Sequence, residues 1–181
     1  MYSKRHGFTL IEILVVISIL AILLAIVTTS FSSVRVDARD KIRVAEVEQA
    51  ILALRLYAAQ YDTFHVANSG HLDGGAGWLT YQGSGGYNQS VSGQLVEGGF
   101  LGKPIQDPLI PTDETWGPGG YAGYQIWYVN DNPLVGACVM ARLENPTESQ
   151  LATLDNLALS AGTLAFARDT YNLNYGLCVQ Q

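Results

Sequence analysis

The most unusual chemical group in this sequence is a carboxylate near the start of an apolar segment. Glu12 is the one charged residue among the twenty residues from Phe8 to Val27. Twenty helical residues, at about 1.5 Å each, can cross a hydrocarbon layer about 30 Å thick. A lone charge in such a helix costs about 2.5–3.5 kcal/mol. We therefore expect Glu12 to have a partner or a function.

Two ordinary targeting signals explain part of this segment. A secretory signal peptide has an apolar region of about 7–15 residues and a small-residue cleavage site after it; this apolar run is longer, and no such site follows. A single-pass anchor, with Lys4 and Arg5 on the cytoplasmic side, fits better. In an anchor, Glu12 would do no more than extend its carboxylate to the lipid headgroups.

A third interpretation accounts for the whole pattern. The stretch Gly7-Phe8-Thr9-Leu10-Ile11-Glu12, with its short basic leader and long apolar run, resembles the class III signal of type IV prepilins. The resemblance implies that a prepilin peptidase cleaves between Gly7 and Phe8 and that the new amine of Phe8 is N-methylated. Residues 1–7 would then be a leader peptide, and the apolar helix would stay in the mature chain.

The resemblance also implies an assembly role for Glu12 and Phe8. In the pilin family this glutamate is thought to pair with the N-terminal amine of a neighbouring subunit. An ammonium and a carboxylate attract each other strongly at low dielectric, whereas either one alone is costly there. Because donor and acceptor lie at different heights on the same helix, the contact does not close on itself and propagates as a helical filament.

No arrangement typical of an enzyme is present in the sequence, and we expect neither catalysis nor a required cofactor. Four residues could be grouped into a metal site, but their spacing matches no ligand motif; they are His65, His71, Asp62 and Asp73. Another four invite comparison with the calcium loop of major pseudopilins, although they lack a regular Asp/Asn alternation; they are Asp107, Asp113, Glu114 and Asp131. We interpret both groups as loop residues, with calcium as the alternative for the second.

Charge is distributed unevenly along the chain. The formal net charge is −6, and loss of Lys4 and Arg5 with the leader would make it −8. From Tyr57 onward, three basic residues face eleven acidic ones. Such an acidic region disfavours generic binding to the phosphate backbone of nucleic acids. The mixed charges between Arg35 and Glu48 predict a solvated helix face, with contacts between subunits as the alternative.

A long helix should follow the leader. Glycine and proline are absent from Phe8 to Ser69, so we expect one helix that ends near Tyr61 or Phe64. An apolar stripe in its second half should face a sheet; it comprises Val47, Ile51, Leu54, Ala58 and Tyr61. Further apolar residues predict that this half is broadly buried; they are Leu52, Leu56 and Ala59.

The rest of the chain predicts a loop region and then a sheet. We expect a short helix within 90–101, strands at 121–129 and 134–143, a helix opened by the capping-box spacing of Thr147 and Gln150, and a last strand at 171–179. The prediction is an α+β pilin fold, a long N-terminal helix packed on an antiparallel sheet of three or four strands. Its parts are 1–7 (leader), 8–30 (membrane span and filament core), 31–64 (exported amphipathic helix), 65–120 (loops) and 121–181 (sheet head).

Two cysteines, Cys138 and Cys178, lie in predicted strands of the exported part. A single pair outside the cytoplasm is expected to form a disulfide, with two buried thiols as the alternative. Closing a loop of this length would stabilise the fold by roughly 3–4 kcal/mol in the chain-entropy treatment. Many pilins have a bridge near the C-terminus.

The first functional hypothesis is a structural one. After cleavage, an inner-membrane prepilin would be polymerised by an assembly platform and its ATPase into a homo-oligomeric type IV pilus at the bacterial cell surface. The second hypothesis is a pseudopilin of a type II secretion system, which forms a short periplasmic filament. The third is a membrane-anchored binding protein that never polymerises.

Overall fold

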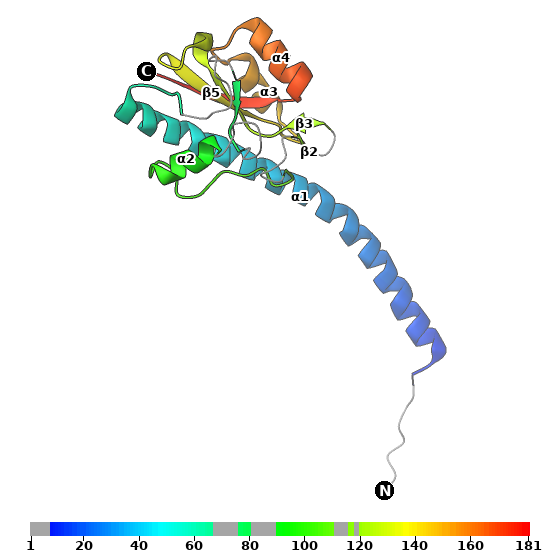
Figure 1. Cartoon of the computed structure of the whole chain (residues 1–181). Coiled ribbons are helices and arrows are strands. Elements are labelled where there is room, and N and C mark those ends of the chain that lie inside the picture. The colour runs from blue at the N-terminus through cyan, green and yellow to red at the C-terminus, as the bar shows by residue number, and fades with distance from the viewer. Residues whose placement is uncertain (1–7, 67–75, 81–89, 111–115, 118–119) are drawn as a thin grey trace. The chain divides into compact units, whose positions relative to one another are not determined.

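A computed structural model describes residues 8–66, 76–80, 90–110, 116–117 and 120–181. By internal contacts the chain divides into two compact units, residues 1–38 and 39–181. Helix α1 (Leu10–Tyr61) contains the boundary between them (Figure 1). Because the boundary lies within this helix, its two parts are described separately.

Helix α1 has 52 residues and is long and apolar enough to cross a membrane. It ends within the predicted range, where Asp62 adopts a left-handed backbone conformation (φ 57°) and its amide still donates to the Ala58 carbonyl at 2.8 Å. Short polar residues adopt that conformation at modest cost and commonly end helices. The absence of glycine and proline thus predicted both the helix and its length.

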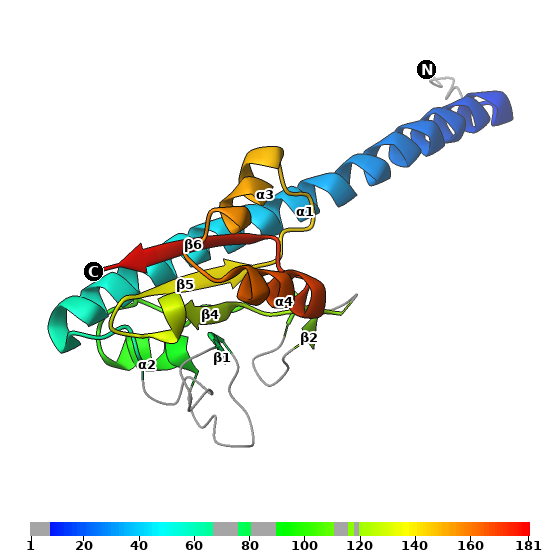
Figure 2. The ribbon, with the colours of Figure 1, turned by 90° about the horizontal axis from the view of Figure 1, so that it is seen from above.

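The second unit is built on a four-stranded antiparallel sheet in the order β1-β4-β5-β6. The strands are β1 (Ala76–Trp78), β4 (Gln125–Tyr128), β5 (Gly136–Ala141) and β6 (Tyr175–Gln180). A separate two-stranded ribbon joins β2 (Trp116–Gly117) to β3 (Tyr121–Ala122). Figure 2 shows the second half of α1 behind the large sheet and α4 (Ala161–Tyr171) in front of it, with α3 (Glu148–Asp155) beside the edge strand β6. This α+β arrangement confirms the predicted fold class.

Two apolar clusters fill the two faces of this sheet. The inner cluster joins Val47, Ala50 and Leu54 of α1 to Ile126 and Val139 of the sheet. The outer cluster joins sheet residues to α3 and α4; it includes Trp127, Met140, Leu154 and Ala167. The sheet is therefore buried on both faces, and the inner cluster fixes its position relative to the part of α1 that belongs to the second unit.

The predicted burial of α1 is correct for one stripe and wrong for the rest. Val47, Ile51, Leu54 and Ala58 are buried as expected, but Tyr61 is 52% exposed. Leu52 and Leu56 are also exposed, at 56% and 49%, so the second half of the helix is not broadly buried. At 3.6 residues per turn, these two leucines lie on the opposite side of the helix from the buried stripe.

Several smaller elements differ from the prediction. The short helix α2 (Val91–Glu97) lies in the expected range, but β1 and β2 fall within residues predicted as loop. Tyr171, expected to open the last strand, instead ends α4. Helix α4 was missed because Gly162, Thr163 and Thr170 are weak helix formers. Its ends are capped by the Ser160 hydroxyl and by Asn172 in a left-handed conformation.

The two cysteines occupy directly opposite positions on neighbouring strands. Cys138 of β5 pairs in register with Cys178 of β6, and the structure joins them by a disulfide. The bridge spans a sequence separation of 40 residues that contains α3 and α4. It thereby ties the C-terminal edge strand to the centre of the sheet.

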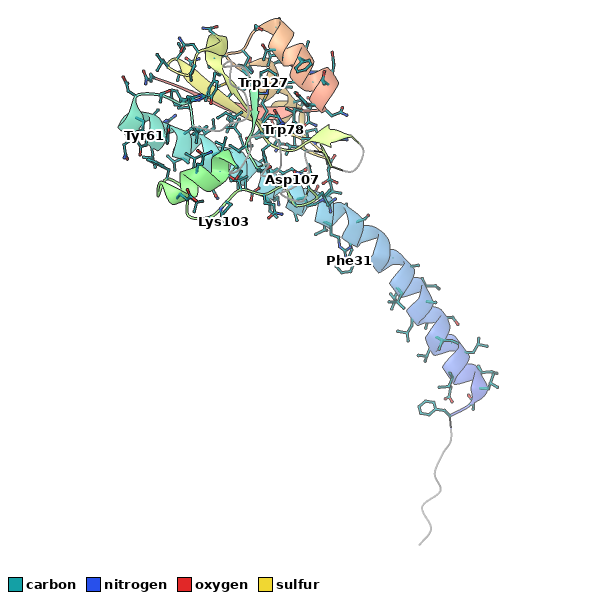
Figure 3. The ribbon with its side chains drawn as sticks, in the orientation of Figure 1. Phe31, Tyr61, Trp78, Lys103, Asp107 and Trp127 are labelled. Atoms are coloured by element: carbon teal, nitrogen blue, oxygen red, sulfur yellow. A yellow bond between two sulfur atoms is a disulfide. The ribbon has the colours of Figure 1, made fainter. Side chains whose placement is uncertain are left out.

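A buried ion cluster connects α1 to two loops of the second unit, residues 39–181, which is called the head from here on. The Arg43 side chain is fully buried, and it donates to Asp107 at 2.9 and 3.2 Å, to Asp40 at 3.1 Å and to Glu144 at 2.8 Å. Arg39 donates two further bonds of 2.6 Å to Glu144. Asp107, labelled in Figure 3, and Glu144 belong to loops far from α1 in sequence. One guanidinium therefore holds three separate segments together.

Asp40 and Glu46 complete this polar part of the core. Asp40 accepts the backbone amides of Glu144 and Asn145 at 2.8 and 2.7 Å. Glu46 accepts the Tyr124 hydroxyl at 2.6 Å, and burial raises the pKa of the Glu46 carboxyl. The prediction of a solvated helix face is therefore wrong at Asp40, Arg43 and Glu46. These three residues are buried, and groups on other segments form hydrogen bonds with their side chains.

Replacing Arg43 should destabilise the protein strongly. Arg43→Met would leave three carboxylates without their shared cation, and breaking a buried ion pair costs about 3–5 kcal/mol. The control is Arg168→Met, because the Arg168 side chain is 52% exposed and its bond to Asp155 lies at the surface; the expected cost there is at most about 1 kcal/mol. Urea unfolding of the full chain in detergent, followed by circular dichroism, measures both. Equal losses for the two variants would contradict the account.

We expect Glu144 to make the free energy of unfolding depend on pH. Hydrogen bonds from Arg39, then Arg43, lower the pKa of the Glu144 carboxyl from 4.5 to about 2. A lowered folded-state pKa stabilises the fold above the unfolded value, and this contribution is lost as the pH falls from about 4.5 towards 2. The stability advantage of the wild-type chain over Glu144→Gln should shrink across that range in urea titrations. A difference that stays constant with pH would show that Glu144 does not act through its charge.

Candidate assembly and processing site

The first turn of α1 holds Glu12 in a closed hydrogen-bond arrangement with Thr9. The Glu12 Oε2 atom accepts both the Thr9 backbone amide at 2.7 Å and the Thr9 hydroxyl at 2.8 Å. In return, the Glu12 amide donates to the Thr9 Oγ1 atom at 3.3 Å. This reciprocal pairing is a capping box, which satisfies amides that a helix start leaves unpaired. Glu12 is thus an integral part of the helix start.

The helix that carries this box has no cover within the described chain. Every described side chain from Phe8 to Ile26 is exposed, and Phe8 is exposed to 83%. In Figure 3 these side chains extend from all sides of the helix. Apolar side chains exposed around the whole circumference are typical of a segment that lies in a membrane or is covered by other chains. The box therefore belongs to a surface that requires an external partner.

The structure describes part of the predicted processing site. Gly7 lies outside the described residues, so the geometry of the Gly7–Phe8 bond is not defined here. Phe8 is described, and because residue 7 precedes it, its nitrogen is an amide and carries no charge. The amine expected to pair with Glu12 would come into existence only when that bond is cut. Cleavage, methylation and subunit pairing at these residues remain predictions.

Thr9 is the residue that the sequence reasoning missed. We assigned no role to it, yet its amide and its hydroxyl both bind Glu12. The signal was present, since Thr9 and Glu12 have the Thr-x-x-Glu spacing of a capping box. The same spacing correctly predicted the box of α3, where Thr147 and Gln150 bind each other reciprocally.

The remaining chemical candidates do not form a second site among the described residues. The His65 ring lies 5.8 Å from the Tyr128 ring, and Asp62 accepts a hydrogen bond from the Gln181 side-chain Nε2 atom at 3.3 Å. His71 and Asp73 lie outside the described residues. No group of three or more histidine, cysteine, aspartate or glutamate side chains in the described part could hold a metal ion.

The calcium comparison concerned four acidic residues, and the structure describes the side chain of one. Asp107 binds Arg43 through both carboxylate oxygens and also accepts the Leu109 amide at 2.8 Å. The side chains of Asp113, Glu114 and Asp131 are outside the described part. Calcium binding by this region was the alternative to the expectation of no cofactor, and Asp107 already binds a cationic side chain of the protein, Arg43.

Comparison with known proteins identifies the N-terminal segment that contains Phe8 and Glu12. Residues 2–28 match the family model of the prokaryotic N-terminal methylation motif. No curated protein and no solved structure matches the chain. The matched residues include Gly7, Phe8, Thr9 and Glu12, and the long helix with its antiparallel sheet is consistent with the pilin fold. The motif supports assignment of this chain to the type IV pilin and pseudopilin family.

Proposed function

We propose that this chain is a structural subunit of a type IV pilus-like filament. A prepilin peptidase would cut between Gly7 and Phe8 at the cytoplasmic side of the inner membrane. Assembly machinery would then move the mature chain from the membrane into a homo-oligomeric filament through its N-terminal helix. The head, residues 39–181, would form the outer surface, at the cell surface in a pilus or in the periplasm in a pseudopilus.

The observation that carries this proposal is the placement of Glu12 in an uncovered apolar helix. A membrane anchor needs apolar residues there, and a carboxylate weakens it. A subunit that polymerises needs a directional contact, and an ammonium opposite a carboxylate provides one at low dielectric. The motif at residues 2–28 supports the same proposal, because methylation requires a free amine at Phe8.

The offset between the two groups favours an open assembly. Phe8 and Glu12 are four residues apart, about one helical turn, so in parallel helices an amine lies opposite a carboxylate only when one copy is shifted along the helix axis, and that shift cannot be reciprocal. Each copy would give its amine to one neighbour and its carboxylate to another. Repetition of that contact yields a filament.

Glu12→Gln is the substitution that tests the proposal. Glutamine keeps the size of the side chain and can still accept from Thr9, but it removes the charge that would attract the amine. We expect cleavage to proceed normally and incorporation into filaments to fall at least about tenfold, which corresponds to about 1.4 kcal/mol. Mass spectrometry of the membrane fraction and of filaments sheared from cells measures both quantities.

The matched control is Glu148→Gln, which removes one carboxylate from an exposed position at the start of α3. Normal incorporation of Glu12→Gln would refute the charge-pairing role. A mature chain that keeps residues 1–7, or that no filament contains, would favour a non-polymerising anchor. Recovery only in short periplasmic filaments, together with secretion machinery, would favour the pseudopilin alternative.

A further inference from the structure

We infer that the outer edge of strand β6 binds an extended, acidic peptide segment of another protein, which adds to the sheet of the head as a further strand. Strand β6 is the last in the order β1-β4-β5-β6, and no described strand pairs with the edge that faces away from β5. The inference goes beyond the proposed function, and it does not depend on whether the chain forms filaments.

Alternate amides of β6 point away from β5. The Gln181 amide donates to the carbonyl of the residue that precedes β5, whereas the Gly176 amide donates to the Thr153 hydroxyl of α3 on the other side. Because the direction of the amides alternates along an antiparallel strand, those of Cys178 and Gln180 face the same way as that of Gly176. Among the described residues, neither of these two amides has a hydrogen-bond acceptor within the chain.

Helix α3 lies beside only the first part of this edge. Figure 2 shows α3 next to the start of β6, while the end of the strand, near the mark C, extends beyond the helix. Cys178 is half-buried there and Gln180 is exposed. Natural proteins protect open edges with charged residues, proline or bulges, and residues 177–181 include neither a charged residue nor proline. The last part of β6 is therefore available for strand addition.

The edge is held in its extended conformation before a partner arrives. The disulfide joins Cys178 to Cys138 of the neighbouring strand β5. Leu177 and Val179, which alternate with the outer residues, pack in the inner cluster against α1. An incoming peptide does not have to order this strand, so less conformational entropy is lost on binding.

A pocket beside the edge has room for side chains of the peptide. It has a volume of about 280 Å³ and lies between the end of α1 and the end of β6, where Ala58, Phe64 and Gln180 line it. Pockets that hold whole small ligands measure about 300–1,000 Å³, so this one is better suited to one or two side chains. In strand addition, main-chain hydrogen bonds provide affinity and such pockets provide specificity.

Arg55 favours an acidic side chain in this pocket. Arg55 is exposed and lines the pocket, and among the described residues no carboxylate forms an ion pair with it. Asp62, the acidic residue of the pocket, accepts a hydrogen bond from the Gln181 side chain. Because an exposed cation attracts an opposite charge, we expect the peptide to carry an aspartate or glutamate that reaches Arg55.

The charges also favour a foreign peptide over a second copy of the chain. Two copies could pair their β6 edges with each other, because each edge offers the same backbone groups. From Tyr57 onward, however, each copy has three basic and eleven acidic residues. Repulsion between two such heads opposes that pairing, whereas a short peptide with one carboxylate can approach through Arg55.

N-methylation of a peptide probe tests the inference without altering the protein. The probe is the fluorescent synthetic peptide Thr-Val-Thr-Val-Glu-Val-Thr-Val, whose β-branched residues favour an extended backbone. Its binding to the full chain in detergent is measured by fluorescence anisotropy. In an added strand, every second amide of the peptide faces β6 and the others face solvent. Methylation of one set should weaken binding at least about tenfold, and methylation of the other set less than about twofold.

Gln180→Pro tests the same edge from the side of the protein. Proline removes the outward amide at this position and is tolerated on an edge strand where that amide faces solvent. Gln180→Ala is the matched control, because it removes the same side chain and keeps the amide. We expect Gln180→Pro to bind the probe about fivefold more weakly than wild type, a loss of the size of one hydrogen bond. Gln180→Ala should bind like wild type.

Arg55→Gln provides a second variant, at an exposed position of α1, that stays informative if Gln180→Pro does not fold. It should bind the glutamate probe more weakly, but it should bind a probe with glutamine in place of the glutamate as wild type does.

Four results would overturn the inference. They are no binding of the unmethylated probe, equal effects of the two methylation sets, equal losses for Gln180→Pro and Gln180→Ala, and an unchanged affinity of Arg55→Gln for the glutamate probe. Dimerisation of the full chain that Gln180→Pro abolishes, without binding of the probe, would assign the edge to a second copy. Because the assay uses no filaments, these results leave the proposed assembly role of Glu12 unaffected.

Discussion

A charge taken out of water must be paired, and this constraint applies in both halves of helix α1. In the head, Arg43 is fully buried and is satisfied by carboxylates from three segments. In the apolar half, Glu12 is held by the amide and hydroxyl of Thr9. The first pairing is complete within the chain and fixes the loops at Asp107 and Glu144. The second uses one carboxylate oxygen of Glu12, and the other accepts no hydrogen bond from the residues that the structure describes.

That difference separates a structural ion cluster from an assembly contact. Replacing a buried pair by apolar residues can leave stability unchanged, so burial of Arg43 is not evidence of exceptional stability. Its consequence is geometric, because the cluster holds two distant loops beside one turn of α1. Glu12 lies on a helix whose described side chains are exposed on all sides. The Glu12 carboxylate can accept further hydrogen bonds, and the apolar helix around it is exposed. Such a surface is suited to binding another copy of the chain.

Periodicity and the absence of helix-breaking residues predicted the long helix, its end near Tyr61 and the stripe through Val47 and Leu54. The apolar and aromatic run around Ile126 predicted the centre of the sheet. The ion cluster could not be predicted, because Asp107 and Glu144 meet Arg43 only after the chain has folded. Leu52 and Leu56 misled us because an apolar side chain can equally face the sheet of its own chain or a neighbouring chain. At the candidate site, the motif predicted roles for Gly7, Phe8 and Glu12. The bonds of Thr9 to Glu12 could have been predicted from the Thr-x-x-Glu spacing of a capping box.

The central claim is that Glu12 meets the amine of Phe8 from another copy. Filaments assembled from a mixture of two preparations, one with ¹⁵N-labelled phenylalanine and one with ¹³Cδ-labelled glutamate, allow that distance to be measured between subunits by solid-state NMR. The account predicts dipolar coupling between the N-terminal amine nitrogen and a glutamate carboxyl carbon at a separation of about 4–5 Å, because an ion pair holds the nitrogen within about 4 Å of a carboxylate oxygen. Absence of any such coupling in wild-type filaments would contradict the account.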